Sequence, residues 1–227
     1  RLLPALTFLW LPMYGMPPTM RWRAPTKATP STLAIAKTVI SLPFGEMDLS
    51  DENKNDVDAS LRVMSFNLRY DNITAERAAA VIAEIKNYNP DVFGVQEDTA
   101  QWSAKLEEVF PEYTPVRYTY DSDTGSEEYE TLYFRTADFK SVESGTKWFS
   151  ETPDVRSSLS GANKVRKMNY AVLTRTSDSK TFCFANTHLD NAGEDSTKWE
   201  SLATVRKQQA EILIAQLKEI SQAHGNI

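Results

Sequence analysis

The stretch Asn89-Pro90-Asp91-Val92-Phe93-Gly94-Val95-Gln96-Glu97 decides the fold. Its apolar centre is too short for a helix and favours extended backbone, so it predicts a fully buried strand. Pro90 marks the turn before the strand, and Gln96 and Glu97 end it. A carboxylate at the end of a buried strand is unfavourable unless hydrogen-bond donors or a cation receive it. A metal ion is one such cation.

The residues before this stretch predict a strand–helix–strand unit. The range 61–66 is a candidate strand that leads into Asn67, and Thr74 can cap a helix with apolar residues at helical spacing. The helix should end before Pro90, because the residue before a proline avoids helical backbone. Parallel strands joined in this way lie side by side. Asn67 and Glu97 should therefore emerge at one sheet edge, where α/β proteins usually bind ligands.

The remaining pattern predicts mixed sheets with flanking helices. A short helix covers about 102–110, and a long helix runs from Ser196 to about Ile220. Between the two helices, five candidate strands form an antiparallel meander separated by turn-rich segments: Thr114–Tyr120, Tyr129–Arg135, Phe139–Phe149, Asn169–Thr174 and Thr181–His188.

Composition restricts the kind of site that the chain can build. Apolar residues make up 41% of the sequence and aromatic residues 11%, enough for a core. The single cysteine, Cys183, excludes an intramolecular disulfide and a cysteine-based zinc site. The two histidines, His188 and His224, cannot form a three-histidine cage. Any bound metal would be held mainly by oxygen, which favours Mg²⁺ or Mn²⁺.

The first 45 residues differ from the rest of the chain. Residues 1–45 carry a net charge of +5 and the whole chain carries −6, so residues 46–227 carry −11. An acidic domain is a poor candidate for non-specific nucleic-acid binding. Residues 1–45 lack the roughly 20 uninterrupted apolar residues of a membrane span. We expect a secretory or organelle-targeting segment, a disordered extension or a gene-model artefact there. Residues 46–60 predict an acidic linker before a domain of residues 61–227.

Five features in a fixed order carry a resemblance to a known family: Ser65-Phe66-Asn67, Gln96-Glu97, Glu128 before a strand, Arg166, and Asn186-Thr187-His188-Leu189-Asp190. With the segment 145–154 between them, this ordered set resembles the endonuclease/exonuclease/phosphatase superfamily, the deoxyribonuclease I-like hydrolases. The match covers about residues 61–220. The resemblance implies an α/β (α+β) fold, a two-layer mixed β-sandwich flanked by helices.

The resemblance also implies a role for each matching residue. Glu97 matches the metal-binding glutamate, and Asn67 matches the asparagine beside the metal and the phosphate. His188 matches the histidine that contacts the phosphate or the leaving oxygen. Glu128 matches the carboxylate that orients this histidine, and Arg166 matches a phosphate-contacting arginine.

The implied activity is hydrolysis of a phosphoester with Mg²⁺ or Mn²⁺, since one carboxylate plus waters suits Mg²⁺. The phosphorylated substrate could be nucleic acid, a phospholipid headgroup, an inositol phosphate or a sugar phosphate. No obligate protein partner is expected.

Several alternatives stay open at this point. Glu97 could be a salt-bridged or capping carboxylate, Arg166 could lie in a solvated turn, and Glu127 or Glu130 could replace Glu128. The family's later Gly-Asp-x-Asn segment and second histidine have no counterpart in this sequence. We therefore expect a fold that is incomplete at the C-terminus, with little activity in this chain. A non-catalytic binding or scaffold protein that retains the fold is the alternative function.

Overall fold

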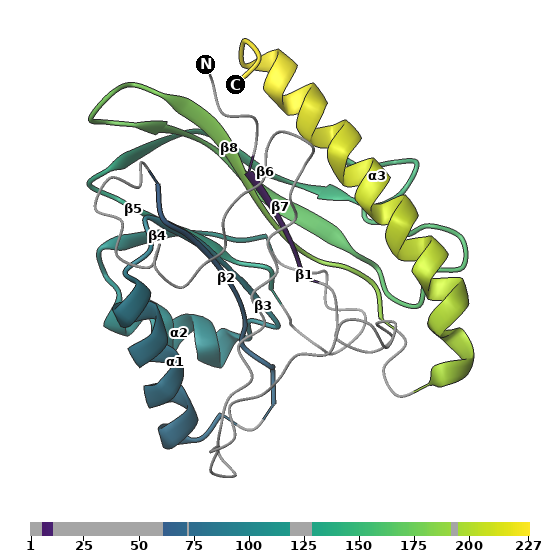
Figure 1. The fold of residues 1–227 in the computed structure, drawn as a ribbon, viewed down its shortest axis with the longest axis horizontal. Coiled ribbons are helices and arrows are strands. Elements are labelled where there is room, and N and C mark those ends of the chain that lie inside the picture. Colours follow the sequence, from purple (N-terminus) through teal and green to yellow (C-terminus); the bar gives the residue numbers. More distant parts are fainter. Residues whose placement is uncertain (1–5, 11–60, 72, 119–128, 192–194) are drawn as a thin grey trace, which may run out of the picture.

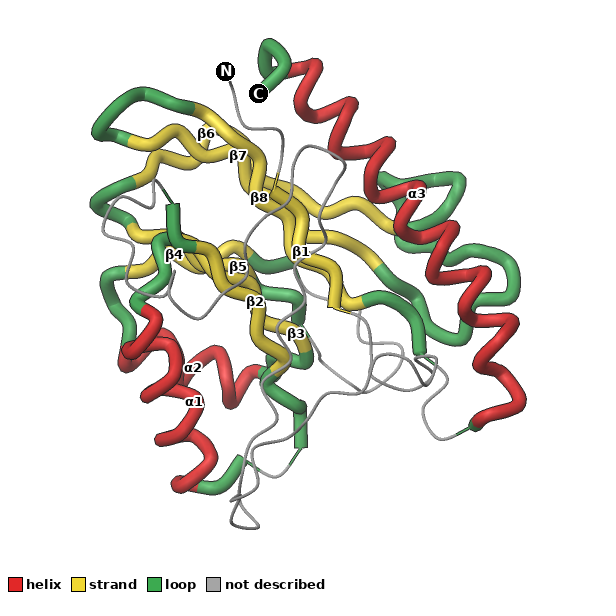
Figure 2. The backbone as a smooth tube through the Cα atoms, viewed as in Figure 1, coloured by secondary structure: helices red, strands yellow, loops and turns green. Residues whose placement is uncertain are grey.

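Two four-stranded sheets face each other in the computed structural model, which describes residues 6–10, 61–71, 73–118, 129–191 and 195–227. Helices α1 and α2 lie on the outer side of one sheet, and α3 lies along the outer side of the other (Figures 1 and 2). The predicted two-layer sandwich with flanking helices is therefore confirmed. No helix in these described ranges is long and apolar enough to cross a membrane.

The first sheet contains the predicted strand–helix–strand unit and has the order β2-β3-β5-β4. β2 and β3 pair in parallel, whereas β5 pairs antiparallel with both β3 and β4. Its elements are β2 (Val63–Asn67), α1 (Ala75–Tyr88), β3 (Val92–Gln96), α2 (Ala100–Val109), β4 (Tyr113–Val116) and β5 (Leu132–Arg135). β4 corresponds to the strand predicted at Thr114–Tyr120, of which residues 119 and 120 lie outside the described ranges.

The second sheet has the order β1-β8-β7-β6. The antiparallel strands β6, β7 and β8 match the predicted meander, and β1 pairs in parallel with β8. β1 lies within the segment 1–45, where no strand was predicted. The rest of that segment and the predicted linker 46–60 lie outside the described residues. The elements are β1 (Leu6–Trp10), β6 (Phe139–Trp148), β7 (Lys167–Arg175), β8 (Thr181–His188), the 3₁₀ helix η3 (Ser196–Lys198) and α3 (Trp199–Ala223).

Local signals explain where α1 begins and ends. The Thr74 side chain accepts a hydrogen bond from the Arg77 backbone N–H at 3.2 Å, as expected of an N-cap. Asn89 ends the helix in the left-handed conformation, with φ of 45°. The last helical residue, Tyr88, lies two residues before Pro90, so the helix ends before the proline as predicted.

The strands divide the apolar interior into three layers. One layer lies between the first sheet and helices α1 and α2, a second between the two sheets, and a third between the second sheet and α3. In β8 the alternation places Phe184 between the sheets and Cys183 in the layer that includes α3 residues. Burial raises the pKa of the Cys183 thiol to about 12.

A pair of buried amides joins the two sheets. Gln96 of β3 donates from Nε2 to Oδ1 of Asn186 of β8 at 2.6 Å. Asn186 in turn donates from Nδ2 to the backbone oxygens of Val95 at 2.8 Å and Thr131 at 3.0 Å. Space for the Asn186 side chain exists because Gly94 has no Cβ: a Cβ at this position would lie 2.5 Å from Cγ of Asn186.

We expect Gly94→Ala to lower the free energy of unfolding by about 3 kcal/mol, because the added methyl group overlaps Asn186 in a packed interior. Urea denaturation measures this loss. In the control Gly161→Ala, a Cβ meets no atom within 4 Å, so that variant should lose only about 1 kcal/mol through its positive φ. Equal losses in the two variants would contradict the steric explanation.

Candidate active site

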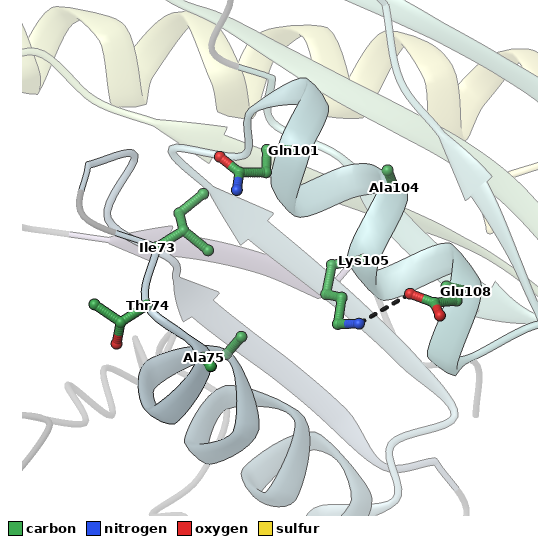
Figure 3. A pocket seen from close by; sticks show the side chains of 8 residues that line it. Ile73, Thr74, Ala75, Gln101, Ala104, Lys105 and Glu108 are labelled. Atoms are coloured by element: carbon green, nitrogen blue, oxygen red, sulfur yellow. Dashed lines mark hydrogen bonds and ion pairs between the residues drawn. The ribbon is translucent and has the colours of Figure 1, made fainter.

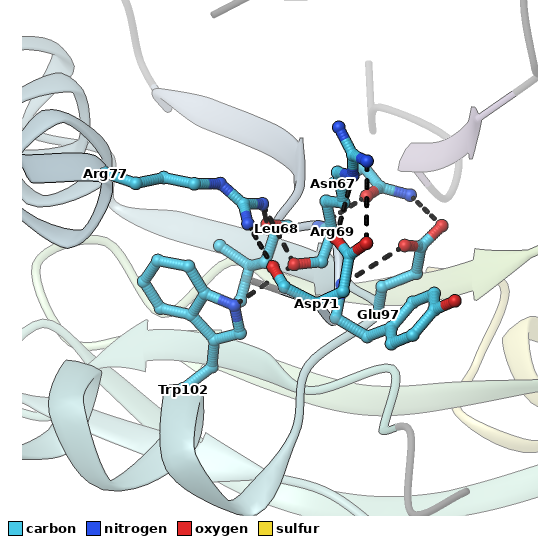
Figure 4. A network of polar contacts seen from close by, with 8 residues as sticks. Asn67, Leu68, Arg69, Asp71, Arg77, Glu97 and Trp102 are labelled. Atoms are coloured by element: carbon cyan, nitrogen blue, oxygen red, sulfur yellow. Dashed lines mark hydrogen bonds and ion pairs between the residues drawn. The ribbon is translucent and has the colours of Figure 1, made fainter. Parts of the chain in front are cut away.

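Asn67 and Glu97 meet at the edge of the first sheet, as predicted from the parallel strands that carry them. Asn67 donates from Nδ2 to Oε1 of Glu97 at 2.9 Å (Figure 4). The backbone N–H of Tyr70 donates to Oε2 of Glu97 at 3.3 Å. Glu97 has a φ of 55°, a backbone angle that residues other than glycine seldom adopt. Such backbone often marks a functional position.

His188 reaches the same place from the second sheet. It is the last residue of β8, and its Nε2 lies 3.9 Å from Oε1 of Glu97. Its side chain is almost fully buried. Burial lowers the pKa of His188 well below its usual value, and the positive charge of Arg166 lowers it further. The imidazole is therefore neutral near pH 7 and can exchange a proton with a reacting group.

Arg166 is buried, and its positive charge acts on the His188 imidazole, so the solvated-turn alternative is wrong for this residue. The loop before Arg166 is held by Asp190, whose Oδ2 accepts the backbone N–H groups of Asn163 at 2.7 Å and Lys164 at 3.2 Å. Asp190 is fully buried, and its own N–H donates to the Gln209 side chain of α3 at 2.9 Å. Asp190 thus holds the backbone of the loop that leads into Arg166, which is a structural role.

The sequence gives little sign of a second buried cation, Lys167. Its Nζ donates to the backbone oxygen of Tyr118 at 2.5 Å and lies 3.8 Å from Oε2 of Glu130. Nζ also lies 5.3 Å from the centre of the Trp148 ring. Burial lowers the pKa of Lys167, while the Glu130 carboxylate opposes that change. The basic run around this lysine is typical of a solvated turn, and only the alternation of β7 could have indicated that Lys167 points inward.

Glu128, the predicted orienting carboxylate, lies outside the described residues, and so does Glu127. The assignment of Glu128 therefore stays a prediction. Glu130, the other alternative, is buried and lies beside Lys167.

Asp98, the residue after Glu97, anchors the end of β3 beneath the site. Its Oδ2 accepts hydrogen bonds from the hydroxyls of Ser103 at 2.7 Å and Thr131 at 2.5 Å. It also exchanges backbone hydrogen bonds with Tyr129. Burial raises the pKa of Asp98 to about 6, although both hydroxyl donors act in the opposite direction.

This shift predicts a change in the pH dependence of stability. The pKa of Asp98 is higher in the folded protein than the usual 3.8, so its contribution to stability is largest below pH 4 and falls as the pH rises to about 6. Asp98→Asn removes that fall. Relative to the unmodified chain, the free energy of unfolding of the variant should rise by about 2 kcal/mol between pH 4 and pH 7.

Chemical denaturation in EDTA at several pH values measures the difference. A constant difference between Asp98→Asn and the unmodified chain across this range would contradict the prediction. EDTA keeps any metal bound at the neighbouring Glu97 from contributing.

The donors at the sheet edge fit a hard divalent cation. The described residues contain no group of three or more His, Cys, Asp or Glu side chains able to hold a metal ion. The oxygen donors near the edge are the Glu97 carboxylate and the Asn67 amide, and Oδ1 of Asn67 already accepts the Arg69 N–H at 2.8 Å. Such a set suits an ion that binds through one carboxylate and keeps several waters, as Mg²⁺ does.

A separate surface pocket lies between the start of α1 and the outer face of α2 (Figure 3). It is lined by Ile73, Ala78 and Ala104 among others, and Lys105 and Glu108 form an ion pair of 2.9 Å at its side. None of the residues predicted for the active site lines this pocket.

Solved structures share this fold. An endonuclease/exonuclease/phosphatase from Bacteroides vulgatus matches with a TM-score of 0.60 and 29% identity, over 70% of this chain and 60% of that one. A Bacteroides thetaiotaomicron protein described as a mannosyl-6-phosphatase matches with a TM-score of 0.63 and 26% identity, over 73% of this chain and 62% of that one. This chain therefore spans less than two thirds of the length of either structure.

A more distant match shares the fold alone. Danio rerio TDP2, solved in complex with a single-stranded DNA product, has a TM-score of 0.54 and 21% identity, over 71% of this chain and 56% of that one. No protein-family model matches the sequence, and no curated protein matches it. The fold and the similarity to the two bacterial structures confirm the predicted resemblance to the endonuclease/exonuclease/phosphatase superfamily, the deoxyribonuclease I-like hydrolases.

Proposed function

We propose that this protein is a phosphoester hydrolase that depends on Mg²⁺ or Mn²⁺ bound at Glu97. The observation that carries the proposal is the meeting of Asn67, Glu97 and His188 from distant parts of the chain, with the charge of the buried Arg166 acting on His188. Asn67 and Glu97 come from the first sheet, and His188 and Arg166 from the second. His188 and Arg166 are both buried basic groups, and ionisable groups held out of water often mark a functional site.

Each side chain has a property that suits phosphoryl chemistry. The Arg166 guanidinium is buried, and its Nε has no hydrogen-bond acceptor within the described part of the chain. A phosphate oxygen would satisfy that group. His188 is neutral near pH 7, and its Nε2 lies 3.9 Å from Glu97, where it could form a hydrogen bond with a bound phosphate ester. A bound divalent cation would polarise the phosphoryl oxygen and stabilise developing negative charge.

Among the possible substrates, we favour a small phosphomonoester over nucleic acid, a phospholipid headgroup or an inositol phosphate. Residues 46–227 carry a net charge of −11, which disfavours a polyanion. One of the two more similar bacterial structures is described as a mannosyl-6-phosphatase. A sugar phosphate is therefore the substrate class that we propose.

Metal binding provides the first test, with Mn²⁺ as a paramagnetic probe detected by electron paramagnetic resonance. We expect Glu97→Gln to weaken Mn²⁺ binding by at least about tenfold, because the variant loses the anionic ligand. The matched control is Glu143→Gln. Glu143 is also paired with a histidine, His224 at 3.1 Å, but it lies in β6 away from the sheet edge that carries Glu97. Equal loss in both variants would contradict the metal assignment.

Phosphate binding and turnover separate an enzyme from a scaffold. We expect Mg²⁺-dependent binding of methyl phosphate that falls at least about tenfold in His188→Ala and Arg166→Ala. Hydrolysis of p-nitrophenyl phosphate and bis(p-nitrophenyl) phosphate is then measured in the same variants. Binding that is unaffected by either substitution would contradict the site. Binding without turnover in a longer form of the protein would favour the scaffold alternative.

A further inference from the structure

The loop 68–71 lies directly beside Glu97 and is held from two helices. The Arg77 guanidinium of α1 donates to the backbone oxygens of Leu68, Arg69 and Asp71 (Figure 4). The indole N–H of Trp102, from α2, donates to the Arg69 oxygen at 3.3 Å. The same guanidinium lies 5.6 Å from the centre of the Trp102 ring.

This clamp supports an unusual backbone conformation. Arg69 has a φ of 57°, which is unfavourable for an L-residue with a side chain and persists only where the surroundings hold it. The clamp and the Asn67 bond to the Arg69 N–H supply that support. The backbone of the loop is therefore held in place beside Glu97 by these hydrogen bonds.

The loop displays an aromatic ring and an ion pair to solvent. The Tyr70 side chain is 54% exposed, although its backbone N–H lies only 3.3 Å from Oε2 of Glu97. On either side of it, Nε of Arg69 lies 2.8 Å from Oδ1 of Asp71 in an exposed pair. The exposed ring leaves apolar area beside Glu97 that a ligand bound there could cover.

We propose that Tyr70 and the Arg69–Asp71 pair form the subsite for the alcohol part of the substrate, and that this part is a hexose. The inference rests on the proposed function, because it places the phosphate at Glu97, Arg166 and His188. A hexose has an apolar face of C–H groups that can pack on the Tyr70 ring. Its neighbouring hydroxyls can accept from a guanidinium and donate to a carboxylate, which the ion pair offers side by side. A nucleobase could also stack on the ring, but it has no neighbouring hydroxyls for the pair.

Isothermal titration calorimetry of the chain with Mg²⁺ tests this inference with three probes: mannose 6-phosphate, 2′-deoxyadenosine 5′-monophosphate and methyl phosphate. The readout is the ratio of each affinity to that of methyl phosphate in the same variant, which cancels changes in the phosphate site. We expect mannose 6-phosphate to bind about fivefold more tightly than methyl phosphate. In Tyr70→Ala the ratio should fall close to one.

Two further variants separate stacking from a general structural effect. Tyr70→Phe keeps the ring and should retain most of the preference for the hexose. The control Val142→Ala removes an exposed apolar side chain from β6 and should leave the ratio unchanged. A role of Tyr70 that is merely structural would not produce this pattern, because it would change all three affinities together.

The remaining outcomes overturn the inference in distinguishable ways. If methyl phosphate binds but mannose 6-phosphate binds no more tightly, or if the preference survives Tyr70→Ala, the subsite is refuted while the proposed phosphate site stands. A preference for the deoxynucleotide refutes the hexose. If no probe binds to the unmodified chain, the proposed function fails and the subsite fails with it.

Discussion

The hydrogen bond between the side chains of Gln96 and Asn186 is the interaction on which the rest of the structure depends. Both amides are fully buried, so each must find partners inside the protein. They find them across the two sheets, and this fixes the sheets in one relative position. Glu97 follows Gln96 directly, and His188 lies two residues beyond Asn186. The bond therefore also sets the short distance between the carboxylate and the imidazole.

The paired sheets also explain how charged groups can be buried near the ends of β3 and β8 and the start of β7. A charge removed from water is unfavourable unless partners replace the lost hydration. Lys167 and Glu130 partly compensate each other, and the lowered pKa keeps His188 neutral. Buried charged groups interact with one another more strongly than the same groups would in water.

Local sequence signals predicted much of this architecture. Thr74, Pro90 and the apolar spacing between them defined α1, because capping and periodicity act within a few residues. The parallel pairing of β2 and β3 then followed, and it placed Asn67 beside Glu97. The family resemblance correctly identified the fold. It also pointed to His188, whose Nε2 lies 3.9 Å from Glu97, and to Arg166, whose charge acts on His188.

Non-local contacts were not predictable in the same way. The pairing of β1 with β8 joins segments about 180 residues apart, and no local pattern indicates it. Lys167 looked solvated because its neighbours in sequence are basic, whereas its surroundings depend on the opposite sheet. The clamp on loop 68–71 depends on Arg77 and Trp102, whose positions relative to the loop are set by two helices. For Glu128 the structure provides no test.

The position of Cys183 has a practical consequence. It is the only cysteine of the chain, and it is buried in the layer between the second sheet and α3. A thiol reagent can reach it only when that layer opens, and the raised pKa keeps the thiol protonated until then. The chain therefore carries a built-in chemical reporter of local opening. The rate at which this single thiol is labelled would show how often α3 separates from the sheet that holds His188 and Arg166.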